Sequence, residues 1–143
     1  MYVPVKKFTP DQKLWFGKLI VEAIKSDGNI DQDEMNYLLS ILHFLSPEQK
    51  SHVTQVLKMQ GKLPGMQNIP EGLTKEDLGN IYTQLVVIVV SDSKFTVAEH
   101  AFLDRVMEWF EFGQVIEQKF TDWTEEMLKV TKSRQEIMEA LSK

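Results

Sequence analysis

The sequence predicts an all-α fold: a single helical domain built on a duplicated helical hairpin. Three observations lead to this prediction. Apolar residues recur through most of the chain at the i, i+3, i+4 and i+7 spacing of amphipathic helices. Serine, threonine or aspartate precedes most of these runs, where a helix N-cap is expected. A segment around residue 27 recurs around residue 92, which indicates an internal duplication.

Length and composition set the class of protein. A chain of 143 residues suits one domain, and its 43% hydrophobic and 26% charged residues are typical of a soluble globular protein. The net charge of −5 and the scattered basic residues argue against a nucleic-acid partner. The absence of cysteine excludes disulfides and thiolate sites and fits a reducing compartment.

No segment has the pattern of a membrane span or a secretory signal. The longest apolar run, residues 85–90, is far short of the roughly 20 residues that a membrane-spanning helix needs. Residues 1–10 contain lysines but lack the apolar core of a signal peptide. We therefore expect a cytoplasmic protein.

The first two helices are expected to form a hairpin. Thr9 stands at the N-cap and Pro10 at the first helical position of an amphipathic run, and Gly28 is suited to end that helix. Asp31 and Glu34 have the spacing of a capping box, which predicts that a second helix begins there and continues to about residue 45.

A third helix and a long loop follow. Ser46 predicts the beginning of a helix that reaches about Gln60. Residues 61–73 contain three glycines and two prolines, and we expect an irregular loop there.

The second half repeats the pattern of the first. Thr74 predicts a helix start, and the apolar run 85–90 is assigned to that helix because no breaker precedes it and it aligns with the first helix. Thr96 and Glu99 form another capping box before a further helix. Residues 114–143 are helical in pattern, and their serines and threonines suggest two shorter helices.

The duplication places four acidic residues in equivalent positions. Aligning residues 20–45 with residues 85–110 keeps apolar character in register along both segments. The identical pairs are Val21/Val86, Ser26/Ser91, Asp27/Asp92, Glu34/Glu99 and Leu38/Leu103. Each copy therefore presents one aspartate and one glutamate at a turn between two helices.

The first acidic turn partly matches a calcium-binding EF-hand loop, in which Asp27, Gly28 and Glu34 would take loop positions 5, 6 and 12. A complete loop also needs oxygen ligands at positions 1 and 3. Those positions hold Ala23 and Lys25 in the first copy, and Ile88 and Val90 in the second. The sequence therefore argues against an EF-hand.

The two turns resemble the motif of the TerB-like family, named for bacterial tellurite-resistance proteins. That motif is an apolar helix ending in A-x-x-D-G-x-I, then x-x-x-E and a second apolar helix, present twice in one helical domain. Residues 23–30 with Glu34 fit the first copy closely. The second copy departs from it, because Ser93 replaces the glycine and Phe95 the isoleucine.

This resemblance covers about residues 10–112 of a single domain spanning residues 1–143, with residues 113–143 as a C-terminal helical extension. It implies a bundle of about seven helices with pseudo-two-fold symmetry and a candidate metal site at the paired acidic turns. It also implies a bacterial stress or tellurite and metal-resistance context. The metal ligands it implies are Asp27, Glu34, Asp92 and Glu99.

Two interpretations of these acidic residues remain open. Carboxylate-only ligation favours a hard divalent cation such as Ca²⁺, Mg²⁺ or Mn²⁺. Alternatively, Glu34 and Glu99 act only as capping-box residues, and Asp27 and Asp92 only cap turn amides or face a helix N-terminus. The first interpretation predicts a metal-binding module and the second a structural adaptor for a protein partner.

No pattern of catalytic residues accompanies the turns. His43, His52 and His100 lack the spacing of a metal or catalytic motif, and no G-x-S-x-G or phosphate-binding loop occurs. We therefore expect no enzymatic activity, no catalytic residue and no cofactor apart from the cation. A protein partner of unknown identity is expected. The tail from residue 121 is expected to dock on the bundle, or else to expose an apolar face to that partner.

Overall fold

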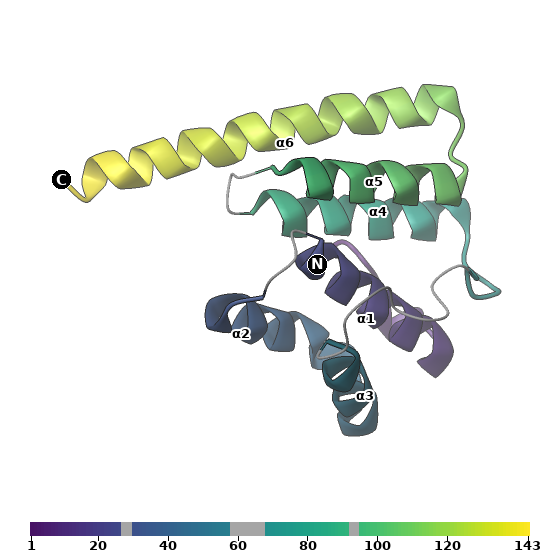
Figure 1. Ribbon diagram of the computed structural model, residues 1–143. Coiled ribbons are helices and arrows are strands. Elements are labelled where there is room, and N and C mark those ends of the chain that lie inside the picture. Colours follow the sequence, from purple (N-terminus) through teal and green to yellow (C-terminus); the bar gives the residue numbers. More distant parts are fainter. Residues whose placement is uncertain (27–29, 58–67, 92–94) are drawn as a thin grey trace.

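The computed structural model describes residues 1–26, 30–57, 68–91 and 95–143, and within these ranges all of the regular structure is helical (Figure 1). The described residues form six α-helices, α1 (Pro10–Lys25), α2 (Gln32–Ile41), α3 (Pro47–Leu57), α4 (Lys75–Val90), α5 (Val97–Phe110) and α6 (Gln114–Leu141), and two 3-10 helices, η1 (Val5–Lys7) and η2 (Leu42–Phe44). The predicted all-α fold class is confirmed. The pseudo-two-fold relation between the halves stays a prediction.

Helix α4 occupies the centre of the bundle. It contacts α1, α5 and α6, and both of its sides therefore meet apolar neighbours. The run 85–90 is helical as predicted, and all of its residues except Val87 are buried. A helix with apolar residues on every side is stable only when other elements surround it.

Helix α1 packs against α2, α3 and α4, and a glycine allows one close approach. A Cβ atom added to Gly17 would lie 2.9 Å from Cδ1 of Leu45, the residue that follows η2. A side chain larger than hydrogen at this position would force the Leu45 side chain to shift.

The predicted N-caps are present. In each, the cap side chain accepts a hydrogen bond from the backbone N–H three residues later, and that residue's side chain accepts one from the cap's N–H. The pairs are Thr9 with Gln12, Asp31 with Glu34, Ser46 with Gln49, Thr74 with Asp77, and Thr96 with Glu99. The predicted C-terminal residue of the first helix, Gly28, lies outside the described residues, and α1 ends at Lys25.

The prediction of two short helices in the tail is wrong, because α6 is one helix of 28 residues. Thr121, Thr124 and Thr131 do not break it, since each hydroxyl donates to the carbonyl four residues earlier. This difference reduces the expected count of about seven α-helices to six among the described residues.

Helix α6 docks on the bundle through its N-terminal part only. The Phe120 ring lies 5.0 Å from that of Tyr82 on α4, and Thr124 is buried. Every residue after Thr131 is exposed, and the C-terminal part of the helix extends beyond α4 and α5 (Figure 1). The N-terminal part of the tail therefore docks on the bundle, and its C-terminal part exposes an apolar face. A partner for that face stays a prediction.

None of the helices described is both long and apolar enough to cross a membrane.

Candidate functional site

The two hairpins meet at a small acidic pocket of about 230 Å³. The C-terminal ends of α1 and α4 and the N-terminal ends of α2 and α5 form its walls. Its lining residues are Ala23, Ile24, Asp31, Asp33, Glu34, Tyr37, Ile88, Val89, Ser91 and Glu99. We name it the turn pocket.

The turn pocket brings together two of the four predicted ligands. Glu34 and Glu99, which occupy equivalent positions in the two halves, both line it. The other two, Asp27 and Asp92, lie outside the described residues, and their place at the pocket stays a prediction.

In the first hairpin the capping box stands at the surface. The Glu34 N–H donates to Oδ1 of Asp31 at 2.8 Å, and the Asp31 N–H donates to Oε1 of Glu34 at 3.4 Å. Asp31 is exposed and Glu34 is half-buried, so water reaches this side of the pocket.

In the second hairpin the equivalent box is more deeply placed. The Glu99 N–H donates to Oγ1 of Thr96 at 3.1 Å, and the Thr96 N–H donates to Oε1 of Glu99 at 3.0 Å. Glu99 is only 7% exposed. A carboxylate buried to this extent is retained only with hydrogen-bond or ionic partners, because its desolvation is costly.

Capping is compatible with a ligand role for both glutamates. The capping hydrogen bonds engage Oε1 of Glu34 and Oε1 of Glu99. A carboxylate has two oxygens and about four acceptor positions, so one oxygen can cap a helix while the group also binds a cation.

The lining residues that were not identified as site residues from the sequence include Asp31, Asp33 and Tyr37. Asp31 is the N-cap of α2 and was interpreted only as part of a capping box, and Asp33 lies in the first turn of the helix. Tyr37 lies one turn after Asp33 on the same side of the helix, and burial raises the pKa of its phenol above 10.0. Residue 37 follows residue 34 by three positions and residue 33 by four, and this spacing was the signal that could have revealed this face.

The helix ends favour negative charge at the turn pocket. Asp33 and Glu34 lie in the first turn of α2, and Glu99 lies in the first turn of α5. The partly positive N-termini of α2 and α5 offset part of the repulsion among these carboxylates. Within the described residues, no three acidic or histidine side chains are arranged to hold a single metal ion.

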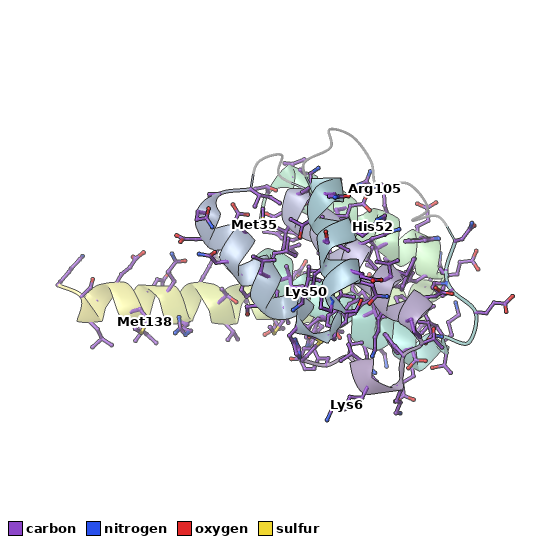
Figure 2. The ribbon with its side chains drawn as sticks, turned by 90° about the horizontal axis from the view of Figure 1, so that it is seen from below. Lys6, Met35, Lys50, His52, Arg105 and Met138 are labelled. Carbon is purple, nitrogen blue, oxygen red and sulfur yellow. The ribbon has the colours of Figure 1, made fainter. Side chains whose placement is uncertain are left out.

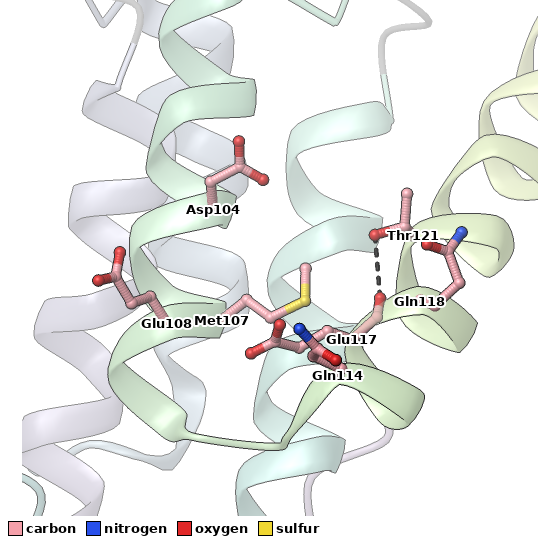
Figure 3. Close-up of a pocket in the computed structure, with 7 residues that line it drawn as sticks. All are labelled: Asp104, Met107, Glu108, Gln114, Glu117, Gln118 and Thr121. Atoms are coloured by element: carbon pink, nitrogen blue, oxygen red, sulfur yellow. Dashed lines mark hydrogen bonds between the residues drawn. The ribbon is translucent and has the colours of Figure 1, made fainter.

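A second acidic pocket lies between α5 and α6 (Figure 3). It has a volume of about 620 Å³ and is lined by Asp104, Met107, Glu108, Gln114, Glu117, Gln118 and Thr121. One of its carboxylates, Asp104, already lies 3.0 Å from Nδ1 of His100. This pocket contains none of the residues that are identical in the two halves, and we name it the α5–α6 pocket.

Comparison with known proteins gives one match. The family model described as "Tellurite resistance protein TerB" matches residues 16–122, from α1 into the N-terminal part of α6. The matched span includes both acidic turns. No match was found among curated proteins or among solved structures.

Proposed function

The chain belongs to the family of the tellurite resistance protein TerB, and from that premise we propose that it is a non-enzymatic module that binds one divalent cation between its two acidic turns. The observation that carries the proposal is the presence of Glu34 and Glu99 in one pocket, although they are far apart in the sequence. We further propose that the module acts in a bacterial stress or metal-resistance response, a context supported by the family name alone.

The donor chemistry favours a hard cation. The turn pocket is lined by the carboxylates of Asp31, Asp33, Glu34 and Glu99, and no cysteine occurs in the chain. Oxygen-only ligand sets suit Ca²⁺, Mg²⁺ and Mn²⁺ better than Zn²⁺, which prefers nitrogen and sulfur ligands. In this proposal Asp27 and Asp92 complete the set, one from each turn.

The proposal predicts that cations stabilise the fold. Carboxylates that converge repel one another, and a bound cation removes that repulsion. A ligand present at 100 times its Kd stabilises the folded state by about 2.7 kcal/mol. The test is the thermal unfolding of metal-stripped protein with and without Ca²⁺, Mg²⁺ and Mn²⁺.

Two double variants make this test specific. Asp27→Asn with Asp92→Asn removes one carboxylate from each turn and is expected to abolish the rise in Tm. Glu108→Gln with Glu117→Gln removes the same charge from the α5–α6 pocket and is expected to keep the rise. No rise with any ion in the wild-type protein, or an equal rise in both double variants, would overturn the proposal.

A second candidate function is a structural adaptor in which the acidic turns act only as helix caps. The capping hydrogen bonds of Glu34 and Glu99 favour it. Glutamine also caps at this position, so Glu34→Gln with Glu99→Gln separates the two functions. The adaptor predicts no loss of stability and no response to cations in either protein, whereas the cation site predicts a response that the substitutions weaken.

A further inference from the structure

The C-terminal part of α6 carries an uncovered apolar surface. Val130, Ile137, Met138 and Leu141 are all exposed, with exposed fractions from 48% for Met138 to 73% for Leu141. This part of the helix projects beyond the rest of the molecule, and Met138 lies on the projecting segment (Figure 2). No described element of the chain covers it.

This surface continues an interface that the chain already forms. Side chains spaced alternately by three and four residues make one stripe along the helix. They are Phe120, Trp123, Met127, Val130, Arg134, Ile137 and Leu141. The first three pack against the hydrophobic core, whereas the last four are exposed. The spacing that suits packing on a neighbouring helix therefore continues where the chain provides no neighbour.

The charges of this segment are separated from the stripe. At 3.6 residues per turn, Lys129, Lys132, Glu136 and Glu139 fall on the opposite side of α6. One charge, that of Arg134, lies in the middle of the stripe. Within the described part of the chain, Arg134 takes part in no ion pair.

A groove adjoins the stripe where α6 leaves α4. It has a volume of about 530 Å³. Its lining residues are Val87, Val90, Ser91, Met127, Val130, Thr131, Arg134 and Gln135. Among the described residues, its walls combine four apolar side chains and three uncharged polar ones with a single cation, that of Arg134.

We propose that this stripe and groove bind an amphipathic helix of a partner protein that carries a carboxylate opposite Arg134. An amphipathic helix laying its apolar face into an apolar groove is a common mode of peptide recognition. A guanidinium covered by a partner needs an anionic acceptor, and a carboxylate matches its paired donors. The proposal is independent of the cation site.

A second copy of the chain suits this surface less well. Pairing two α6 stripes antiparallel places two Arg134 side chains in one short apolar interface. Glu136 and Glu139, the acidic residues that follow Arg134 in α6, lie on the opposite side of each helix. The charge pattern therefore favours a different, acidic partner.

The test uses two synthetic helical peptides of about six turns, with leucine on one face and identical except for a central glutamate or arginine in that face. Their binding to the full chain is measured by fluorescence anisotropy. We expect the wild-type protein to bind the glutamate peptide about tenfold more tightly than the arginine peptide. We expect Arg134→Glu to reverse this preference.

Two further variants serve as controls. Lys132→Glu changes the charge by the same amount on the far side of α6, and we expect it to keep the wild-type preference. Ile137→Asp lies outside the bundle, where it leaves the fold intact, and we expect it to abolish binding. Equal affinity for the two peptides, no binding of either, or a wild-type dimer that Ile137→Asp dissociates would overturn the proposal.

Discussion

The two helical hairpins, α1 with α2 and α4 with α5, begin from matching sequence motifs but occupy different environments. Tyr37 on α2 is 40% exposed, whereas its counterpart in the alignment, Phe102 on α5, is 2% exposed. Helix α2 buries only Leu38 and Ile41, while α5 buries residues along its whole length. A repeated motif therefore determines where the helices begin, but its neighbours in the bundle determine how much each helix buries.

The same contrast applies at the acidic turns. Both glutamates accept a hydrogen bond from the N-cap residue, yet Glu34 is half-buried and Glu99 is buried. Glu34 is partly open to solvent, and its copy of the motif is the closer to the family pattern. Glu99 is enclosed, and its copy departs further from that pattern. The two glutamates therefore give the turn pocket one accessible side and one desolvated side.

The largest expected difference between the hairpins concerns the core. Phe102→Ala should lower the free energy of unfolding by about 3–5 kcal/mol, because it leaves a cavity among buried side chains. Tyr37→Ala should cost less than about 1 kcal/mol, since water already reaches its ring. Urea denaturation of both variants checks the comparison. Equal losses would show that the two hairpins contribute alike to the core.

The next difference appears at high pH. Burial raises the pKa of Tyr82 to about 12 from 10.0, with a smaller contribution from the charge of Asp104, and a hydrogen bond with Thr124 opposes them. Below pH 10 the phenol is protonated in both the folded and the unfolded chain. Between pH 10 and about 12 the unfolded chain loses this proton more readily, so stability falls as pH rises.

This pH dependence is measured by chemical denaturation from pH 8 to pH 11.5, comparing the wild-type protein with Tyr82→Phe and Tyr37→Phe. We expect Tyr82→Phe to remove most of the alkaline loss, which amounts to about 2 kcal/mol when the two pKa values differ by about 2 units. Burial also raises the pKa of Tyr37, but this side chain is partly exposed, so Tyr37→Phe should remove less. A larger effect of Tyr37→Phe than of Tyr82→Phe would contradict the deeper burial of Tyr82.

The smallest difference concerns the caps. Thr96→Ala and Asp31→Ala each remove a side-chain acceptor and should each cost about 0.5–2 kcal/mol. Thr96→Ala should cost more, because the N–H that it leaves unpaired belongs to the buried Glu99, whereas water can reach the N–H of Glu34. Thermal unfolding of the two variants compares them. A larger loss of stability for Asp31→Ala would contradict the expectation that the more buried cap contributes more.

The helices and their caps could be predicted from the sequence because their signals are local. Each capping box involves residues only three positions apart, and the run 85–90 was assigned correctly because it lies within a continuous helical pattern. The tail was misjudged because threonine is neutral as a helix signal. Its hydroxyl can bond to the preceding turn, as Thr124 does with the Phe120 carbonyl.

The candidate site could be predicted only in part. The duplication identified Glu34 and Glu99, since equivalent residues of two similar hairpins can meet. It gave no indication of Asp33 or Tyr37, which reach the turn pocket through the packing of α2 against the rest of the bundle. Likewise, the groove beside Arg134 depends on where α6 leaves α4, and no local pattern specifies that position.

Isothermal titration calorimetry of the metal-stripped protein tests most directly whether the two unequal turns share one cation. Ca²⁺, Mg²⁺ and Mn²⁺ are titrated into the wild-type protein, Asp27→Asn and Asp92→Asn. A shared site predicts one ion per chain, with affinity lost in either single variant. No binding heat with any ion, or two ions per chain of which each variant loses one, would contradict a site shared between the hairpins.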